Sequence, residues 1–348
     1  MSNQPGMAGA AYQNATDPWR QWVILLAALL VSKPAWPQLV PGSLDFQWSE
    51  GSPDCAGSPP PPLEVHRYNA QTFILRESLC STFEAPFMYL LIGSGRALLI
   101  DTGDVADPSR MPLAKTVMSL LPGAGSTKLP LLVVHTHRHL DHRAGDPQFA
   151  HLPNVQVVGY DLASVQAYYR FDGWPNSLGH IDLGDRQIDV MPTPGHNETE
   201  VSFYDGKTGL FFSGDFLLPG RLLIDDTTAD IESADRVSSF IKDHPVTFVL
   251  GGHVEMNSKG GLFSWGSQYH PHEHILQLSR DDLLALPAVL RTFNGIYTVR
   301  GRYVMMNSLR ILLIEAVVLL SILGALVALT VRFIRRRRAR QLRAAVAG

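Results

Sequence analysis

The chain has 348 residues, of which 45% are hydrophobic and 18% are charged, and its formal net charge is −3. This length accommodates one large domain with appended segments, or two domains. The small negative charge gives no basis for a nucleic-acid partner, so we expect none.

The N-terminal region contains an apolar run, Trp22–Ser32, that follows Arg20 and ends before Lys33. Its length suits the hydrophobic part of a secretory signal and is short for a membrane-spanning helix. Lys33 stands where cleavage of a signal needs a small residue, which makes an uncleaved anchor the alternative. We therefore assign residues 1–35 to a signal or membrane anchor; a buried core helix is a third interpretation.

Residues 36–64 are rich in Pro, Gly and Ser, a composition typical of a linker.

The folded domain is expected at residues 65–300. In chain order, periodicity and turn residues predict strands at 72–77, 87–93 and 97–103, a helix at 111–121, strands at 129–137 and 155–160, a helix at 162–170, a hairpin turning at 205–209, a helix at 233–244 and a strand at 246–253. Strands mixed with helices and hairpins favour sheets covered by helices.

Toward the C-terminus, Leu309–Val331 is apolar and long enough to cross a hydrocarbon core of about 30 Å. Its one acidic residue, Glu315, lies in its first third, near an interface where a charge costs less. Arginines are concentrated in residues 332–348, which follow this segment. The positive-inside rule therefore predicts a membrane anchor with a basic cytoplasmic tail, and a domain on the periplasmic or extracellular side.

Polar side chains gather at the ends of the expected strands. Asp101, the histidine cluster around His137, Asp215 and His253 each end an apolar strand, and a loop adds His196. Strand ends of α/β folds are where ligand sites are built, and a buried carboxylate or imidazole must be paired or bind a metal. One such residue would be structural in most proteins, but several in one chain indicate a metal site.

The motifs that contain these residues resemble those of the metallo-β-lactamase-fold hydrolases. The signature H-x-H-x-D-H is matched by THRHLDH at 136–142, and IDTG, TPGH, SGD and GGH resemble the family's other motifs at 100–103, 193–196, 213–215 and 251–253. One departure is Ala144, which precedes Gly145 where the family has two glycines. The resemblance implies an α/β fold, the αββα four-layer sandwich, with metals at one edge between the two sheets.

The resemblance also implies the ligands, position by position. The first of two metals would be held by His137, His139 and His196, and the second by Asp141, His142 and His253. Asp215 would bridge the two metals, and Asp101 would support the ligands without binding a metal itself. His135 lies outside the motif, and we interpret it as structural. Imidazole and carboxylate ligands suit Zn²⁺, with Fe and Mn as alternatives.

The function implied is hydrolysis by a hydroxide held between two divalent metal ions, with catalysis dependent on Asp141 and Asp215. In this family a bridging Asp resembles thioesterases and lactonases rather than true β-lactamases, so we expect a carboxylic ester, thioester or lactone as the small-molecule substrate. Glutathione thioester hydrolases carry a long helical C-terminal domain, for which the stretch between His253 and Leu309 leaves little room.

Three alternatives stay open. A β-lactam hydrolase would use the same carbonyl chemistry. A mononuclear iron enzyme that oxidises persulfides would use His137, His196 and Asp215 as its ligands. A metal-binding sensor without catalysis would more plausibly have lost ligands, and none is lost.

Two further features carry expectations. The segment after His253 offers Phe263, Trp265, Tyr269 and His272, which either line a substrate pocket or belong to a surface loop packed on its own domain. The chain has two cysteines, Cys55 and Cys80. Because an exported domain meets oxidising conditions, we predict a disulfide between them, with two free thiols as the alternative.

Overall fold

The computed structural model describes residues 38–346 of the chain. The expected N-terminal signal or anchor, residues 1–35, lies outside them. The described part contains two six-stranded sheets, one three-stranded sheet and the helices that cover them.

The first sheet contains the early strands in sequence order. These are β1 (Leu63–Asn69), β2 (Thr72–Glu77), β3 (Phe87–Ile92), β4 (Ala97–Ile100), β5 (Leu131–Val134) and β6 (Val155–Val157). The pairs from β1 to β4 are antiparallel, and β4, β5 and β6 run parallel. Every residue of β2 to β5 is buried, and this agrees with the continuously apolar sequences of β3, β4 and β5. β2 also contains the buried polar residues Thr72, Arg76 and Glu77.

The second sheet has the order β13-β12-β10-β9-β8-β7. Its strands are β7 (Gly179–Asp182), β8 (Gln187–Pro192), β9 (Val201–Asp205), β10 (Leu210–Gly214), β12 (Phe248–Gly251) and β13 (Gln277–Leu278). The predicted hairpin is present, since Leu210 of β10 pairs with Asp205 of β9. β12 joins β10 in parallel.

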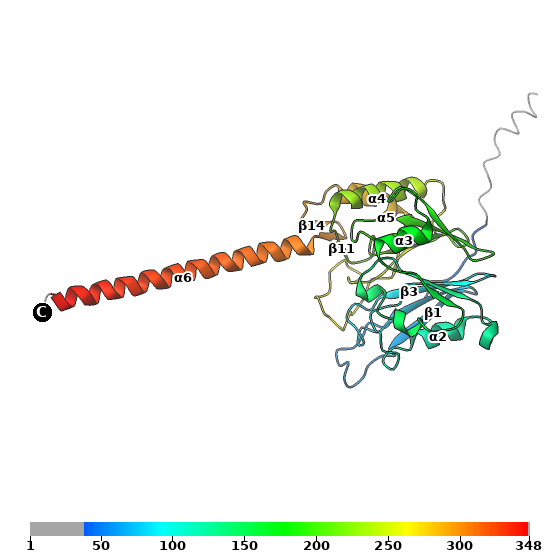
Figure 1. Cartoon of the computed structure of the whole chain (residues 1–348), viewed down its shortest axis with the longest axis horizontal. Coiled ribbons are helices and arrows are strands. Elements are labelled where there is room, and N and C mark those ends of the chain that lie inside the picture. The colour runs from blue at the N-terminus through cyan, green and yellow to red at the C-terminus, as the bar shows by residue number, and fades with distance from the viewer. Residues whose placement is uncertain (1–37, 347–348) are drawn as a thin grey trace, which may run out of the picture. The chain divides into compact units, whose positions relative to one another are not determined.

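Three clusters of buried apolar residues lie between the layers of the fold. One lies between the two sheets and contains Phe87 and Tyr89 from the first with Phe203 and Phe212 from the second. Another joins the outer face of the first sheet to α2 (Leu113–Leu120). The last joins the outer face of the second sheet to α4 (Thr227–Phe240) and α5 (Arg280–Leu290) (Figure 1). The expected αββα sandwich is confirmed; α3 (Leu162–Tyr169) packs against the central cluster.

Two helices differ from the sequence expectation. α4 begins at Thr227, earlier than the predicted residue 233, because Asp226 caps it by accepting hydrogen bonds from the backbone N–H groups of Thr228 and Ala229. α5 was not predicted. It begins with a capping box, in which Ser279 and Asp282 each accept from the other's backbone N–H.

The C-terminal part adds a small sheet and a long helix. The sheet has the order β11 (Arg221–Leu223), β15 (Tyr303–Met306), β14 (Tyr297–Arg300). The helix, α6, runs from Ser308 to Val346 without a break (Figure 1). Among residues 38–346 it is the one helix long and apolar enough to span a membrane, with a mean hydropathy of 2.8 in its most apolar window. It continues beyond the expected span into the arginine-rich tail.

Residues 38–62, within the expected linker, form no helix and only an isolated strand bridge, yet they pack on the domain. The Trp48 ring lies 5.2 Å from the ring of core residue Phe87, and Cys55 forms a disulfide with Cys80. This segment is therefore a packed coil rather than a free spacer, which the Pro, Gly and Ser content alone does not reveal.

Candidate metal centre

Seven histidine and aspartate side chains meet at one edge of the sandwich in two groups. The first group is His137, His139 and His196; the second is Asp141, His142, Asp215 and His253. Within each group the potential ligand atoms all lie within 4.8 Å of one another. These are the seven residues that the motifs indicated.

The fold delivers these side chains from chain segments that follow strands. The signature segment begins two residues after β5, and its Leu140–His142 part forms a short 3₁₀ helix. His196 follows β8, Asp215 follows β10 and His253 follows β12. Since β10 and β12 are parallel neighbours, Asp215 and His253 emerge side by side.

In the first group, three imidazole nitrogens converge. Nε2 of His137 lies 2.9 Å from Nδ1 of His139, and Nε2 of His196 lies 3.0 Å from the same atom. Burial lowers the pKa of His137 well below its usual range, and the neighbouring imidazoles lower it further. Neutral rings with lone pairs aimed at one point fit a bound cation.

In the second group, carboxylates surround two buried imidazoles. Nε2 of His253 lies 3.2 Å from Nε2 of His142 and 3.3 Å from an oxygen of Asp141. Burial alone would lower the pKa of His253, but Asp215 and Asp141 outweigh it and raise the pKa to about 10. The group therefore strongly favours an added positive charge, which a divalent metal supplies in place of protons.

Asp215 faces both groups. Its Oδ2 lies 3.7 Å from Nε2 of His196, and its Oδ1 lies 3.5 Å from Nε2 of His142 and 3.6 Å from Nε2 of His253. Oδ1 is buried without a hydrogen-bond donor. Burial alone would raise the pKa of Asp215, but His253 and His142 lower it well below its usual range. Asp215 is thus an ionised carboxylate that lies between the two groups of candidate ligands.

In three of the candidate ligand rings, the nitrogen that points away from the group is fixed by an acceptor. Nδ1 of His142 lies 2.9 Å from Asp101, Nδ1 of His196 lies 2.9 Å from the carbonyl of Leu223, and Nδ1 of His253 lies 2.8 Å from the carbonyl of Glu84. In each case the proton belongs on Nδ1, which leaves the lone pair of Nε2 for the metal.

Asp101 supports the site through two contacts besides His142. It accepts hydrogen bonds from the backbone N–H of Thr136 at 2.7 Å and from the Thr136 hydroxyl at 2.9 Å. Its φ is +65°, a left-handed conformation that costs about 1 kcal/mol for a residue with a Cβ. The strain accompanies a carboxylate that holds both the signature segment and a ligand.

Two glycines lie where the site leaves no room for a side chain. A Cβ on Gly252 would lie 2.4 Å from Oδ1 of Asp215, and one on Gly145 would lie 2.3 Å from the carbonyl of Thr102. Ala144, the departure from the family motif, is not among the residues with a positive φ, so its Cβ brings no backbone strain.

His135 joins neither group. Its Nε2 lies 2.8 Å from Asp146, which also accepts from the hydroxyl of Thr102.

Comparison with known proteins identifies the family of the chain. The family model "Metallo-beta-lactamase superfamily" matches residues 81–286, more than half of the chain. The chain belongs to the metallo-beta-lactamase superfamily. The family expected from the motifs is therefore confirmed.

Relatives in the superfamily include thioester hydrolases. The chain is 26% identical over 232 residues to an acyl-coenzyme A thioesterase MBLAC2 from Gallus gallus, covering 57% of this chain and 82% of the relative. It is 29% identical over 213 residues to a hydroxyacylglutathione hydrolase from Methylobacillus flagellatus, covering 59% and 76%. Among solved structures, a metallo-beta-lactamase from Hirschia baltica is similar with a TM-score of 0.46 and 16% identity, covering 66% and 97%.

The superfamily site opens into a cavity of about 400 Å³. Besides metal-ligand candidates, its walls contain residues that the motifs did not indicate: Phe83, Glu84, Asp104, Leu140, Leu218, Arg221, Leu223, Glu255 and Trp265. The Arg221 guanidinium lies 5.4 Å from the Trp265 ring centre. Burial raises the pKa of Glu84 to about 7, against the opposing effect of His253.

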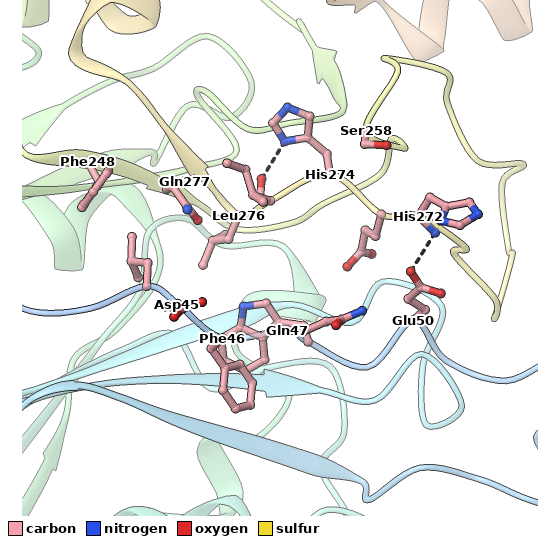
Figure 2. A pocket seen from close by; sticks show the side chains of 14 residues that line it. Asp45, Phe46, Gln47, Glu50, Phe248, Ser258, His272, His274, Leu276 and Gln277 are labelled. Atoms are coloured by element: carbon pink, nitrogen blue, oxygen red, sulfur yellow. Dashed lines mark hydrogen bonds between the residues drawn. The ribbon is translucent and has the colours of Figure 1, made fainter.

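Of the four candidate pocket residues, Trp265 alone lines this cavity. Phe263 stacks on His270 at 4.0 Å, and Tyr269 lies outside the cavity. His272 lines a separate groove of about 680 Å³, where its backbone N–H donates to Glu50 (Figure 2). The four residues were candidates for one substrate pocket, but packing places them in different surroundings.

Proposed function

We propose that the protein is a binuclear metallohydrolase that cleaves thioesters, with Zn²⁺ as the metal in both sites. His137, His139 and His196 would hold one ion, and Asp141, His142 and His253 would hold the other. The observation that carries the proposal is the position of Asp215, whose two oxygens face the two groups separately.

The reaction adds water across the bond between the acyl carbon and sulfur, and it yields a carboxylic acid and a thiol. When bound, the two ions lower the pKa of water and polarise the substrate carbonyl. Asp215 keeps the two groups together, and Asp101 and the carbonyl of Glu84 hold the rings of His142 and His253 in the ligating orientation. The buried side chains thus supply a preorganised site that needs little movement on binding.

The thioester class is supported by the names of two relatives, the acyl-coenzyme A thioesterase and the hydroxyacylglutathione hydrolase. The cavity supports an acyl substrate as well, because apolar Phe83, Leu140 and Trp265 border it and are 38%, 59% and 59% exposed. Exposed apolar side chains around a polar centre are typical of sites that bind an apolar group next to a reacting carbonyl.

The test is one preparation of the full-length protein, assayed for metal content by elemental analysis and for turnover on acyl-coenzyme A and acylglutathione thioesters, carboxylic esters, lactones, a β-lactam and glutathione persulfide. We expect two zinc ions per chain and turnover of a thioester. A single iron with oxidation of the persulfide would replace the proposal by the dioxygenase alternative. Metal without turnover of any substrate would favour the sensor.

We further propose that α6 anchors the protein in a membrane, with the metal centre on the periplasmic or extracellular side. Support comes from the apolar span and from the arginines that follow it, which are Arg332, Arg335, Arg336, Arg337, Arg338, Arg340 and Arg343. A reporter enzyme that is active only after export should be active when fused near Leu286 and inactive when fused after Arg340. The reverse pattern would place the metal centre in the cytoplasm.

A further inference from the structure

The three-stranded sheet connects the metal cavity to the beginning of α6. β11 pairs with β15 in parallel, and β15 pairs with β14 antiparallel. The registers align Leu223, Met306 and Tyr297 in one row across the sheet. Because residues opposite one another on neighbouring strands project from the same face, these three side chains share a face.

The adjacent row shows which face this is. It consists of Leu222, Met305 and Thr298, and it projects to the other side because successive residues of a strand alternate. Leu222 and Met305 are buried in the apolar cluster that contains α4 and α5 residues. The row that starts at Leu223 therefore points away from that core.

The inner end of this row lies at the metal centre. Leu223 lines the metal cavity, and its carbonyl accepts from Nδ1 of the ligand candidate His196. Met306, in the middle of the row, is only partly buried. An apolar surface thus begins in the metal cavity and continues across β15.

The outer end of the row lies where the chain enters α6. Tyr297 is 47% exposed on the edge strand, and its neighbour Ile296 is 40% exposed. The carbonyl of Ile296 accepts from the backbone N–H of Asn307, which directly precedes α6. Apolar side chains are exposed here beside the helix that we propose to enter the membrane, where an acyl chain is also most soluble.

We propose that the row Leu223–Met306–Tyr297 is the acyl-binding subsite of the enzyme and that its substrates are long-chain acyl thioesters. This inference rests on the proposed thioesterase function. Leu223 and Tyr297 are two strand spacings apart, roughly 10 Å, so a short acyl group ends near Leu223 and a long one reaches Tyr297. Contact of the far methylenes with Met306 and Tyr297 gives the preference for length.

The test compares butanoyl- and dodecanoyl-coenzyme A as substrates of the full-length protein in phospholipid nanodiscs. The wild type should have the higher kcat/KM for the dodecanoyl thioester. Tyr297→Asp should lower the dodecanoyl-to-butanoyl ratio of kcat/KM at least about tenfold, mainly through KM, because a charge replaces apolar contact. Tyr297→Phe should keep the ratio. Tyr269→Asp is the matched control, since Tyr269 is 40% exposed and lies outside the cavity and the row.

A wild type with no preference for length, or a Tyr297→Asp variant with an unchanged ratio, overturns the subsite. If no thioester is cleaved, the proposed function fails. The subsite is then tested separately, by the binding of fatty acids to a labelled variant. Both native cysteines form the disulfide, so Tyr297→Cys adds one free thiol for an environment-sensitive fluorophore. Dodecanoic acid should shift its emission to the blue and butanoic acid should not, while the same label at Tyr269→Cys reports unspecific partitioning. Equal shifts at both positions refute the subsite.

Discussion

The two sides of the metal cavity are built differently. On the ligand side, each imidazole or carboxylate follows a buried strand, and buried groups such as Asp101 hold it in place. In the rest of the cavity wall, Phe83, Arg221 and Trp265 come from three separate segments. The Trp265 ring centre lies 6.2 Å from that of Phe83 and 5.4 Å from the Arg221 guanidinium. The ligand side, which would carry out the proposed reaction, depends on local motifs, whereas the wall, which would contact the proposed substrate, depends on how distant segments pack.

The largest expected effect comes from substitutions of candidate metal ligands. Asp215→Ala should loosen both metal sites, because its two oxygens face different groups. Asp141→Ala should loosen the second site and leave most of the metal in the three-histidine site. Since metal ions supply several kcal/mol to such reactions, turnover should fall by roughly 10³ or more in both variants. Elemental analysis and turnover of the same samples measure this.

His135→Ala is the control, because its imidazole binds Asp146 and joins neither ligand group. Its metal content should equal that of the wild type. One tightly bound iron in the wild type, unaffected by Asp141→Ala, would contradict the binuclear centre.

The second-largest expected effect comes from the ion pair that supports the cavity wall. Arg76, 1% exposed, forms two hydrogen bonds with Glu273, 7% exposed, and so ties the loop that carries Trp265 to β2. Removing one partner leaves a buried charge, so Arg76→Met or Glu273→Gln should lower the free energy of unfolding by about 3–5 kcal/mol. Replacing both residues by methionine should cost less than either single change. Chemical denaturation followed by tryptophan fluorescence provides the values.

The same pair predicts a pH dependence. Burial alone would raise the pKa of Glu273, but Arg76 and His270 outweigh it and lower the pKa below the usual 4.5. A lowered pKa contributes stability above the unfolded-state pKa and loses it as the pH falls through the folded-state pKa. Below pH 4.5 the wild type should therefore lose stability that Glu273→Gln already lacks. Parallel curves for the two proteins would show that the pair does not titrate in this range.

A smaller effect tests what holds the ligands. Asp101→Asn keeps the shape of the side chain but removes the charge beside Nδ1 of His142, so metal affinity should fall about 10- to 100-fold. Competition with a chelator measures the affinity. Asp107→Asn, at a fully exposed carboxylate, is the control and should change nothing. Equal affinities in the three proteins would mean that the charge of Asp101 is not needed to orient His142.

The contrast between the two sides also explains what the sequence could predict. The residues of the two groups could be singled out because a strand end, a short motif and a buried polar residue coincide within a few positions. β3 was predicted because it is continuously apolar, and β2 because the apolar residues Phe73, Ile74 and Leu75 form its centre. β1 and β11 were not, since β1 is largely half-buried with mixed polarity and β11 has three residues.

The wall could not be predicted from local patterns. Phe83 reaches the cavity because its loop is tied by the Cys55–Cys80 disulfide and by the hydroxyl of Thr82, which donates to Asp104. Arg221 is placed by Glu255, which accepts from its backbone N–H and pairs with its guanidinium. Each contact joins segments far apart in sequence, and no spacing or periodicity encodes it.

The smallest effect sharpens the comparison at the wall itself. Trp265 is 59% exposed at the cavity and lies beside Arg221 and Phe83, so its ring is available to a substrate. Trp265→Ala should remove about 1 kcal/mol of substrate binding, which raises KM roughly fivefold. The metal content should not change, and kcat should change little, because the ligand side is untouched. Tyr269→Ala removes a 40%-exposed aromatic ring of the same loop that does not line the cavity, and it should leave KM unchanged. Loss of metal in Trp265→Ala would show that the wall and the ligands are one cooperative unit.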